Sequence, residues 1–463
     1  MTYHLTINYH QTDSRMKIPL PPPSLNELMQ EASAETLPQL ARLKLGPLAN
    51  GHYLHWDDLR HRTPPEGLNH KIWWLALRLA RSVSANTLPF HDKQGEAFSY
   101  TLPEPLLKNL HEIDRGAGLV PGGEDSAVLR ADQGRYLISS LIEESITSSQ
   151  MEGASTTRRV AEAMLREGRK PGTLSERMIF NNFEAMRRIR DICRDTLEPG
   201  HVIELQRVLT EGTLEPPEDC GQLRTSDDIE IVAPNNDRLV LHRPPHHSEL
   251  AQRLQALCDF ANATVSDNTF IHPIVRAILL HFMVGYDHPF ADGNGRTGRA
   301  LFYWYMAKQG YWLIEYLSIS RILRKAPAQY ARAYLLTETD SGDTTYFLLH
   351  QTEVILKGLS ALHQYLQQKQ QEQAQLSAKL RALQTSEKQL NHRQTALLAH
   401  ALKRPDEYFT IESHQRSHQI AYATARADLM ALAELGLLSE VLHGRRKKVF
   451  YPAPDIRQKL ESV

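Results

Sequence analysis

The chain has 463 residues, of which 41% are hydrophobic, and its formal net charge is −1 at pH 7. This length allows two to four domains and a sizeable core, and the near-neutral balance excludes a global electrostatic attraction to nucleic acid or to an acidic partner. Three cysteines, Cys193, Cys220 and Cys258, lie far apart without metal-ligand spacing. They favour a reducing compartment over a disulfide scaffold.

The N-terminal sequence MTYHLTINYH lacks the layout of a signal peptide. The most apolar stretch, IVRAILLHFMVGY, is interrupted by Arg276 and His281 and is too short to span a bilayer. We therefore expect a soluble, cytoplasmic protein without membrane contact.

Residues 1–95 form the first predicted region, a mixed and partly helical one. The proline run PLPPPS indicates an extended entry, and HKIWWLALRLARSVSA is typical of a helix with a large apolar face. Nothing in this region points to a particular chemistry.

Residues 96–350 are predicted to be mostly helical. Apolar residues recur at helical spacing in RYLISSLIEESITSSQ, and the pattern continues in SERMIFNNFEAMRRIRDICRDT and HVIELQRVLTEGT. In one segment, DIEIVA and RLVLH alternate apolar with polar residues around PNND, which predicts a β-hairpin over Ile229–Leu241. HPIVRAILLHFMVGY then predicts a buried helix, and a further helix should begin near Asn294 and end at Gly310.

The last two regions are a linker and a small domain. Residues 351–390, rich in Gln, Leu, Ala, Lys and Glu, indicate a long and largely exposed helix, either a linker or a short coiled-coil seam. Residues 391–463 predict helix, short strand, helix, helix and hairpin, which is the order of a winged helix-turn-helix. The expected recognition helix, AYATARADLMALAELG, carries Thr424 and Arg426, and the wing turn spans 444–448.

This last region holds 11 Lys and Arg against 8 Asp and Glu, a net charge of +3, with four cations together in the wing. Binding of DNA through residues 391–463 is therefore one hypothesis. Binding of protein is the alternative, because the recognition helix is rich in alanine.

The segment YDHPFADGNGRTGR, between the two central helices, contains a GxGxxG pattern. A dinucleotide site would need a strand before the glycines and an acidic residue about 20 positions later. The preceding stretch is better explained as a helix that Pro289 ends, and no helix–sheet alternation surrounds it. We therefore reject an NAD site.

The polar residues of the segment favour phosphoryl or nucleotidyl chemistry. His288 can accept a proton from a hydroxyl at neutral pH, and the Asp292 carboxylate suits Mg²⁺ shared with phosphate oxygens. Gly293 and Gly295 let the backbone approach a ligand, and Asn294 with the next N–H groups lies at a helix N-terminus that favours an anion. Two cations, Arg296 and Arg299, share one face of that helix.

Residues His288–Arg299 match the motif HPFx(D/E)GNGRxxR at every defined position, and roughly residues 100–340 resemble the Fic (filamentation-induced-by-cAMP) family. The resemblance implies a mainly α fold: a helical core with a β-hairpin flap, followed here by the C-terminal winged helix-turn-helix. It also implies transfer of AMP from ATP, with Mg²⁺, to a Ser, Thr or Tyr hydroxyl of a protein target, including the enzyme itself.

The resemblance implies a role for each motif residue. His288 would be the catalytic base, and Asp292 would bind Mg²⁺ at the α- and β-phosphates. Gly293, Asn294 and Gly295 would form the anion-binding turn. Arg296 and Arg299 would hold the β- and γ-phosphates, and Phe290 would point into the core. Where the family has adjacent tyrosines at the purine, this chain has Tyr330-Ala331, so one is missing.

A second match lies in SSQMEG, which fits the inhibitory motif (S/T)xxxE(G/N) of the family through Ser148, Glu152 and Gly153. The resemblance implies that Glu152 reaches Arg299. A carboxylate on that guanidinium removes the partner of the γ-phosphate. The catalytic region 96–350 would thus include its own inhibitory helix.

Other functions stay open at this stage. The chain could be a nucleotide-sensing DNA-binding regulator, could remove AMP rather than attach it, or could transfer a phosphate, UMP or phosphocholine group on the same fold. The hairpin would present a target segment by strand addition. A homodimer, as in many members of the family, is a further expectation.

Overall fold

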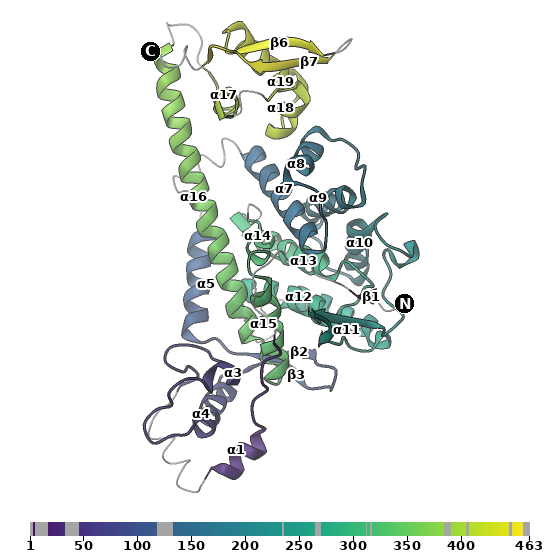
Figure 1. The fold of residues 1–463 in the computed structure, drawn as a ribbon, viewed down its shortest axis with the longest axis vertical. Helices are drawn as coiled ribbons and strands as arrows, with labels where there is room; N and C mark the ends of the chain where they lie inside the picture. The colour runs from purple at the N-terminus through teal and green to yellow at the C-terminus, as the bar shows by residue number, and fades with distance from the viewer. Residues whose placement is uncertain are drawn as a thin grey trace.

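The computed structural model describes residues 3–4, 17–32, 46–117, 133–233, 236–263, 270–311, 313–314, 317–383, 390–403, 407–443 and 447–456. These residues are mostly helical, with three small sheets (Figure 1), so the predicted mainly α class is confirmed. Among them no helix is both long and apolar enough to cross a membrane.

The elements follow the expected order with a few additions. The N-terminal part contains β1 (Tyr3–His4), α1 (Leu25–Glu31), α3 (Trp56–Leu59), α4 (His70–Val83), β2 (Asn86–His91) and β3 (Ala97–Tyr100). The helices of the central part are α5 (Glu104–Ala117), α7 (Gln133–Met151), α8 (Arg158–Glu167), α9 (Leu174–Ile192), α10 (Pro199–Thr210), α11 (Leu250–Asn262), α12 (Pro273–Asp287), α13 (Asn294–Lys308), α14 (Ile319–Leu323), α15 (Pro327–Thr339) and α16 (Thr345–Leu383). Its hairpin is β4 (Ile229–Ala233) and β5 (Asn236–His242), and the C-terminal part contains α17 (His392–Lys403), α18 (Ile411–His418), α19 (Tyr422–Glu434), β6 (Leu438–His443) and β7 (Lys447–Pro452).

Helices α12 and α13 form the centre of the main core. Pro273 occupies the first turn of α12, where its missing N–H costs nothing, and nearly every side chain of the helix is buried. Gly298 lets α13 approach closely, because a β-carbon there would lie 3.1 Å from the His281 backbone oxygen. The loop between these two helices is therefore held on both sides by well-packed structure.

Two boundaries differ from the sequence-based expectation. The hairpin β2–β3 was not predicted, and Leu88 and Phe90 of β2 pack into the main core, so residue 95 lies inside a hairpin rather than between regions. Helix α16 begins at Thr345, and its early residues Val354 and Ile355 are buried in the same core. The expected exposed linker therefore starts within a core helix, which runs beside α5 toward the C-terminal part (Figure 1).

The hairpin predicted over Ile229–Leu241 is present as β4 and β5, and residues 234–235 of its turn lie outside the described residues. Its pairing is antiparallel with two shifts in register. One edge of the hairpin, that of β4, is partly occupied by β1, which pairs with it in parallel through Tyr3 and His4.

The C-terminal part has its own hydrophobic core, which includes Leu398, Leu429 and Phe450. Its elements follow the expected order of helix, bridge strand, helix, helix and hairpin. Its identification as a winged helix-turn-helix and its binding of DNA stay predictions. Of the predicted wing, residues 444–446 lie outside the described residues, and Lys448 forms an ion pair of 2.6 Å with Glu440.

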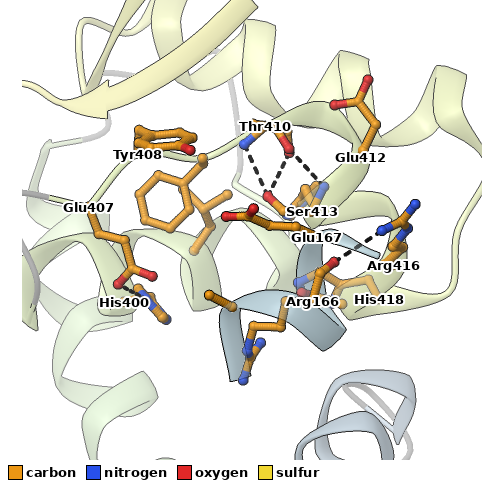
Figure 2. A pocket seen from close by; sticks show the side chains of 15 residues that line it. Arg166, Glu167, His400, Glu407, Tyr408, Thr410, Glu412, Ser413, Arg416 and His418 are labelled. Carbon is orange, nitrogen blue, oxygen red and sulfur yellow. Dashed lines mark hydrogen bonds and ion pairs between the residues drawn. The ribbon is translucent and has the colours of Figure 1, made fainter. Parts of the chain in front are cut away.

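Helix α18 brings this C-terminal part against α7 and α8. A pocket lies at the junction, with Arg166 and Glu167 of α8 on one wall and Thr410, Ser413 and other C-terminal residues on the other (Figure 2). The C-terminal part thus contacts the helix that ends at the predicted inhibitory motif.

Helix α7 is also anchored to the core by a buried carboxylate. Glu144 accepts hydrogen bonds from the hydroxyls of Ser318 and Ser320 and from the backbone N–H of Ser320, all at the start of α14. Burial raises the pKa of Glu144, while these donors act in the opposite direction. This buried contact therefore attaches α7 to the start of α14.

We expect Glu144→Ala to lower the free energy of unfolding by about 2–4 kcal/mol, because it removes a buried acceptor from three donors. Chemical denaturation of the whole chain measures the change. Glu112→Ala is the matched control, since Glu112 makes only an exposed pair of 3.9 Å with Lys108 and should cost about 0.5 kcal/mol or less. Equal effects of the two substitutions would contradict the anchoring role.

Candidate active site

His288 lies directly after the last residue of α12 and is held in an uncommon backbone conformation. Its φ is 45°, in the left-handed region, which is rare for a residue with a side chain and is found at functional sites. Its Nδ1 lies 3.0 Å from the backbone oxygen of Gly285. Because a carbonyl only accepts, Nδ1 must carry the proton, and Nε2 is left with the lone pair of a base.

The surroundings of His288 keep the imidazole neutral. Burial lowers its pKa to about 4, although the hydrogen bond to Gly285 acts in the opposite direction. The ring is therefore in the form that accepts a proton at neutral pH.

The turn before α13 is shaped by two side-chain features. The Asn294 amide donates to the backbone oxygen of Phe290 at 2.8 Å and accepts from its N–H at 3.0 Å, which closes the loop. Phe290 itself is fully buried, as predicted. Gly293 has a φ of 86°, and a β-carbon there would lie 2.7 Å from the Thr210 methyl group.

Gly293 also serves as the N-cap of α13 without offering a side chain. Within the described residues, the first N–H groups of α13, including those of Asn294 and Gly295, therefore have no capping side chain. Such a helix N-terminus is a binding site for an anion. The Asn294 side chain is used within the loop, so only its backbone is available to a ligand.

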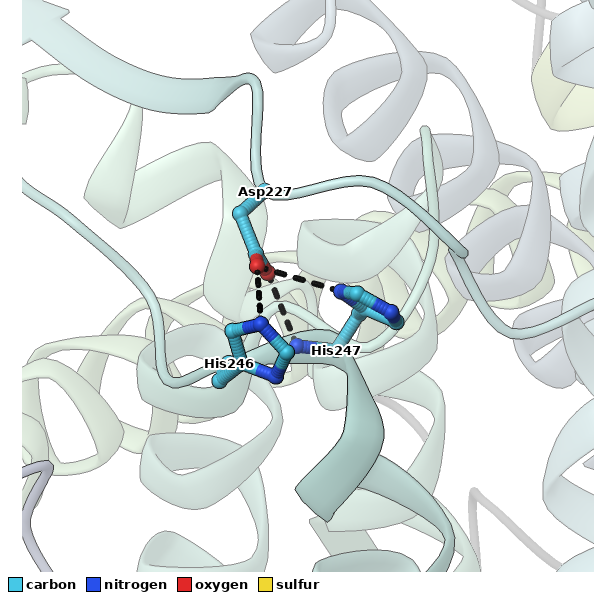
Figure 3. Close-up of side chains that lie close together, drawn as sticks. All are labelled: Asp227, His246 and His247. Carbon is cyan, nitrogen blue, oxygen red and sulfur yellow. Dashed lines mark hydrogen bonds and ion pairs between the residues drawn. The ribbon is translucent and has the colours of Figure 1, made fainter.

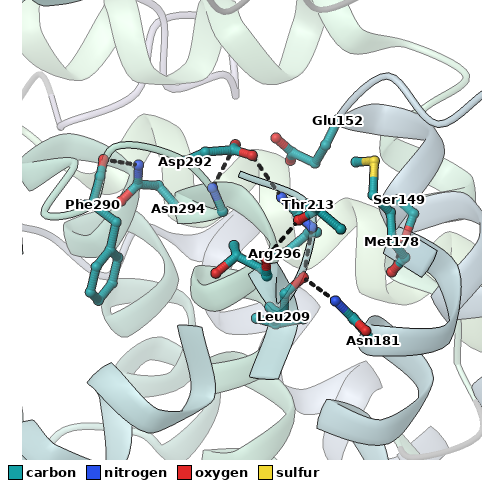
Figure 4. A network of polar contacts seen from close by, with 12 residues as sticks. Ser149, Glu152, Met178, Asn181, Leu209, Thr213, Phe290, Asp292, Asn294 and Arg296 are labelled. Atoms are coloured by element: carbon teal, nitrogen blue, oxygen red, sulfur yellow. Dashed lines mark hydrogen bonds and ion pairs between the residues drawn. The ribbon is translucent and has the colours of Figure 1, made fainter. Parts of the chain in front are cut away.

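Arg296 and Asp292 form an ion pair of 3.0 Å one helical turn apart (Figure 4). Arg296 also donates to the backbone oxygen of Leu209 at 2.9 Å, at the C-terminal end of α10. Its Nε is buried and has no partner among the described residues. The Asp292 side chain remains 29% exposed and offers a hard oxygen ligand at the mouth of the turn.

Arg299 is held by the predicted inhibitory motif. Its Nε donates to the Ser148 hydroxyl at 2.9 Å, and its Nη2 donates to the Ser148 backbone oxygen at 3.2 Å and to Glu152 Oε1 at 2.8 Å. The Arg299 side chain is only 2% exposed and that of Glu152 16%. The structure thus brings together the two motifs, which lie 147 residues apart from Glu152 to Arg299.

Two glycines allow this contact. Helix α7 ends at Met151, and Gly153, two residues later, has a left-handed φ of 96° that prevents the helix from continuing past Glu152. At Gly295, a β-carbon would collide with Glu152 Oε1 and lie 3.0 Å from Arg299 Nη1. The carboxylate therefore occupies the space immediately above the turn of α13.

Sequence reasoning missed several residues that position the site. Arg224 donates from Nε to the His288 backbone oxygen at 2.9 Å, and Gln206 donates to the Asp292 backbone oxygen at 3.0 Å. Tyr334 lies one turn after Tyr330, and their hydroxyls are 3.4 Å apart. Nothing in the spacing of the sequence indicates that Arg224 and Gln206 belong to the site. The two tyrosines of α15, four residues apart, could have been predicted from their helical spacing.

The arrangement combines a neutral base, a helix N-terminus and buried guanidinium groups within one loop. It can remove a proton from a hydroxyl beside a bound polyanion. Of the predicted site residues, the geometry gathers His288, Asp292 and Arg299 with Glu152 around the same turn.

Comparisons with known proteins find similarity to one family. The sequence model of the Fic/DOC family matches residues 196–306. "Protein adenylyltransferase Fic" of Drosophila willistoni is 39% identical over 70 residues, which cover 15% of this chain and 14% of that relative. The protein of the same name from Nematostella vectensis is 42% identical over 60 residues, covering 13% of this chain and 14% of its own length. The chain thus spans about one seventh of these relatives, and the matches confirm the resemblance drawn from the motif.

The solved structures that resemble this chain share a lower sequence identity with it. A Fic family protein from Desulfovibrio desulfuricans G20 is 18% identical with a TM-score of 0.49, over 77% of this chain and 98% of that one. Fic-1 of C. elegans (residues 134–508) is 20% identical with a TM-score of 0.42, over 57% of this chain and 72% of that one.

We expect Glu152→Gln to strengthen binding of inorganic triphosphate by about 10–100-fold, because the anion no longer competes with a carboxylate for Arg299. Isothermal titration of both proteins measures the change. Arg299→Ala added to Glu152→Gln should cancel the gain, and a gain that survives would contradict the assignment of this anion site.

The burial of His288 predicts a pH effect on stability. A histidine whose pKa falls from 6.5 in the unfolded chain to about 4 in the folded chain loses stability as pH falls through that window. Relative to His288→Gln, the wild type should lose roughly 3 kcal/mol of unfolding free energy between pH 7 and pH 4. Denaturation at the two pH values measures the difference, and a constant gap would mean that the ring is not desolvated.

Proposed function

Because this chain belongs to the Fic family, we propose that it is an auto-inhibited protein adenylyltransferase that transfers AMP from ATP to hydroxyl groups of proteins. The observation that carries the proposal is that one loop and the helix after it hold His288, whose Nδ1 is bonded to Gly285, a helix N-terminus without a capping side chain, and the buried Arg299. The names of the relatives in Drosophila and Nematostella support the choice of AMP as the transferred group.

In the proposed reaction, His288 Nε2 takes the proton of the target hydroxyl. The hydroxyl oxygen forms a bond to the α-phosphorus of ATP, and the bond from that phosphorus to the bridging oxygen of the β-phosphate breaks. Pyrophosphate leaves with the electron pair of the broken bond. The N–H groups at the start of α13 and the Arg299 guanidinium stabilise the phosphate charge.

Asp292 is the residue that would hold Mg²⁺. Its carboxylate stands at the edge of the anion turn and is partly exposed, which fits a hard cation shared with phosphate oxygens. The ion would neutralise charge on the leaving group. Arg296, which pairs with Asp292 and Leu209, keeps that carboxylate in place.

Glu152 supplies the inhibition in this proposal. A γ-phosphate would need the guanidinium of Arg299, which now binds the carboxylate at 2.8 Å. ATP could then bind only with its phosphates displaced from the in-line geometry. Release requires the end of α7 to move, and the contact of α18 with α7 places the C-terminal part where it could influence that movement.

The hairpin β4–β5 would position the target segment by strand addition. The pairing of β1 with β4 supports this, because a segment distant in sequence already adds to that edge. Backbone pairing of this kind reads little sequence, which suits modification of different targets or of the chain itself.

We expect Glu152→Gly to gain the mass of one or more AMP groups after incubation with Mg-ATP, while the wild type gains less. Intact-mass spectrometry of the purified chain measures the gain. Glu152→Gly combined with His288→Ala is the control, because loss of a general base should reduce the rate about 10²–10⁴-fold.

The outcomes separate the two parts of the proposal. Equal labelling of the wild type and Glu152→Gly would refute inhibition by Glu152. Labelling that survives the loss of His288 would refute its role as the base. If the chain itself is a poor acceptor, α-labelled ATP with a cell extract supplies target proteins, and absence of labelling there would refute adenylyl transfer.

A further inference from the structure

Three metal-ligating side chains converge at the base of the hairpin, outside the catalytic loop. Asp227 precedes β4 by two residues, and His246 and His247 follow the end of β5. Asp227 Oδ2 lies 2.8 Å from His246 Nε2 and 3.1 Å from His247 Nδ1 (Figure 3). One ligand atom from each residue lies within 4.8 Å of the other two.

These distances fit a small divalent transition metal. Zinc binds His nitrogen and carboxylate oxygen at about 2.0–2.2 Å, so two ligands of a tetrahedral ion lie roughly 3.4 Å apart. The two nitrogen–oxygen distances are shorter by a few tenths of an ångström, which small rotations of the side chains would supply. Two imidazoles with one carboxylate also form a catalytic-type zinc set that leaves a position for water.

The atoms not aimed at the metal position are occupied by oriented partners. Asp227 Oδ1 accepts from Arg224 Nη1 at 2.9 Å and from the backbone N–H of His247 at 2.8 Å. His246 Nδ1 lies 2.8 Å from the Ser248 hydroxyl. Partners of this kind fix the orientation of ligands in metal sites. They leave Asp227 Oδ2 and His246 Nε2 facing each other at 2.8 Å.

The ordinary alternative is a surface ion pair between Asp227 and the two histidines. The side chains are 41%, 56% and 36% exposed in the order Asp227, His246 and His247, so such pairs would contribute little stability. A carboxylate oxygen can accept a hydrogen bond from each ring, so these contact distances fit either explanation. The two explanations differ in whether the set binds Zn²⁺.

We propose that Asp227, His246 and His247 form a Zn²⁺ site that fastens the two ends of the β4–β5 hairpin. The consequence for the catalytic loop runs through Arg224, which is 7% exposed. Arg224 bonds Asp227, the backbone oxygen of Pro245, and that of His288. An ion on Asp227 would therefore hold the hairpin against the loop that carries the base. This assignment does not depend on which group the enzyme transfers.

The test is a competition titration of the metal-stripped full chain with Zn²⁺ and a chromogenic chelator near neutral pH. We expect binding of one Zn²⁺ that His246→Ala and His247→Ala each weaken at least about tenfold. Both histidines are on the surface, so the variants should fold, which circular dichroism checks. His111→Ala, an exposed histidine of α5, is the matched control and should bind as the wild type does.

A second measurement tests the fastening. Hydrogen exchange of residues 229–242 should slow on addition of Zn²⁺ in the wild type and in His111→Ala, but not in His246→Ala combined with His247→Ala. An affinity for Zn²⁺ that is the same in the wild type, His246→Ala, His247→Ala and His111→Ala would overturn the site. Specific binding without slower exchange in the hairpin would overturn the fastening role.

Discussion

The turn between α12 and α13 is the constraint on which the rest of the site depends. Its shape needs a left-handed residue at His288, a glycine at 293 and an amide at Asn294 that bonds both backbone groups of Phe290. A left-handed backbone at a residue with a side chain, such as His288, is unfavourable by itself. The close packing of α12 on α13 and the burial of Phe290 fix these three residues together in one loop.

The buried contact between Arg299 and Glu152 is a second constraint on the site. A guanidinium that is 2% exposed requires a partner, and either a carboxylate of the chain or a phosphate of a ligand can serve. Replacing the carboxylate by a phosphate would keep a negative charge beside Arg299. Such an exchange therefore does not require the protein to unfold. Arg299 also donates two hydrogen bonds to Ser148 in the last turn of α7, so its orientation depends on that helix as well as on the carboxylate.

The sequence predicted the central helices, the hairpin and the residues of the turn because each has a local signal. Burial of α12 follows from its apolar residues, and the start of α13 follows from the glycines. The partners that complete the site have no such signal. Arg224 and Gln206 donate to backbone oxygens of residues more than 60 positions away, and only the packed fold brings them near. The Leu209 backbone oxygen likewise accepts from the distant Arg296 side chain. The hairpin β2–β3 was missed because each strand is short and its apolar positions are few.

The elements around the turn are anchored by side-chain contacts of their own. Helix α7 is held at its middle by Glu144 and at its end by Arg299, and α18 of the C-terminal part contacts it from outside. A change that loosens the end of α7 while Glu144 stays bound would free Arg299 without disturbing the core. The two ends of the hairpin are linked to the same loop through Arg224, which bonds Asp227, Pro245 and His288. The segment from His288 to Arg299 is thus tied to two separate parts of the fold, to α7 through Glu152 and to the residues before β4 through Arg224.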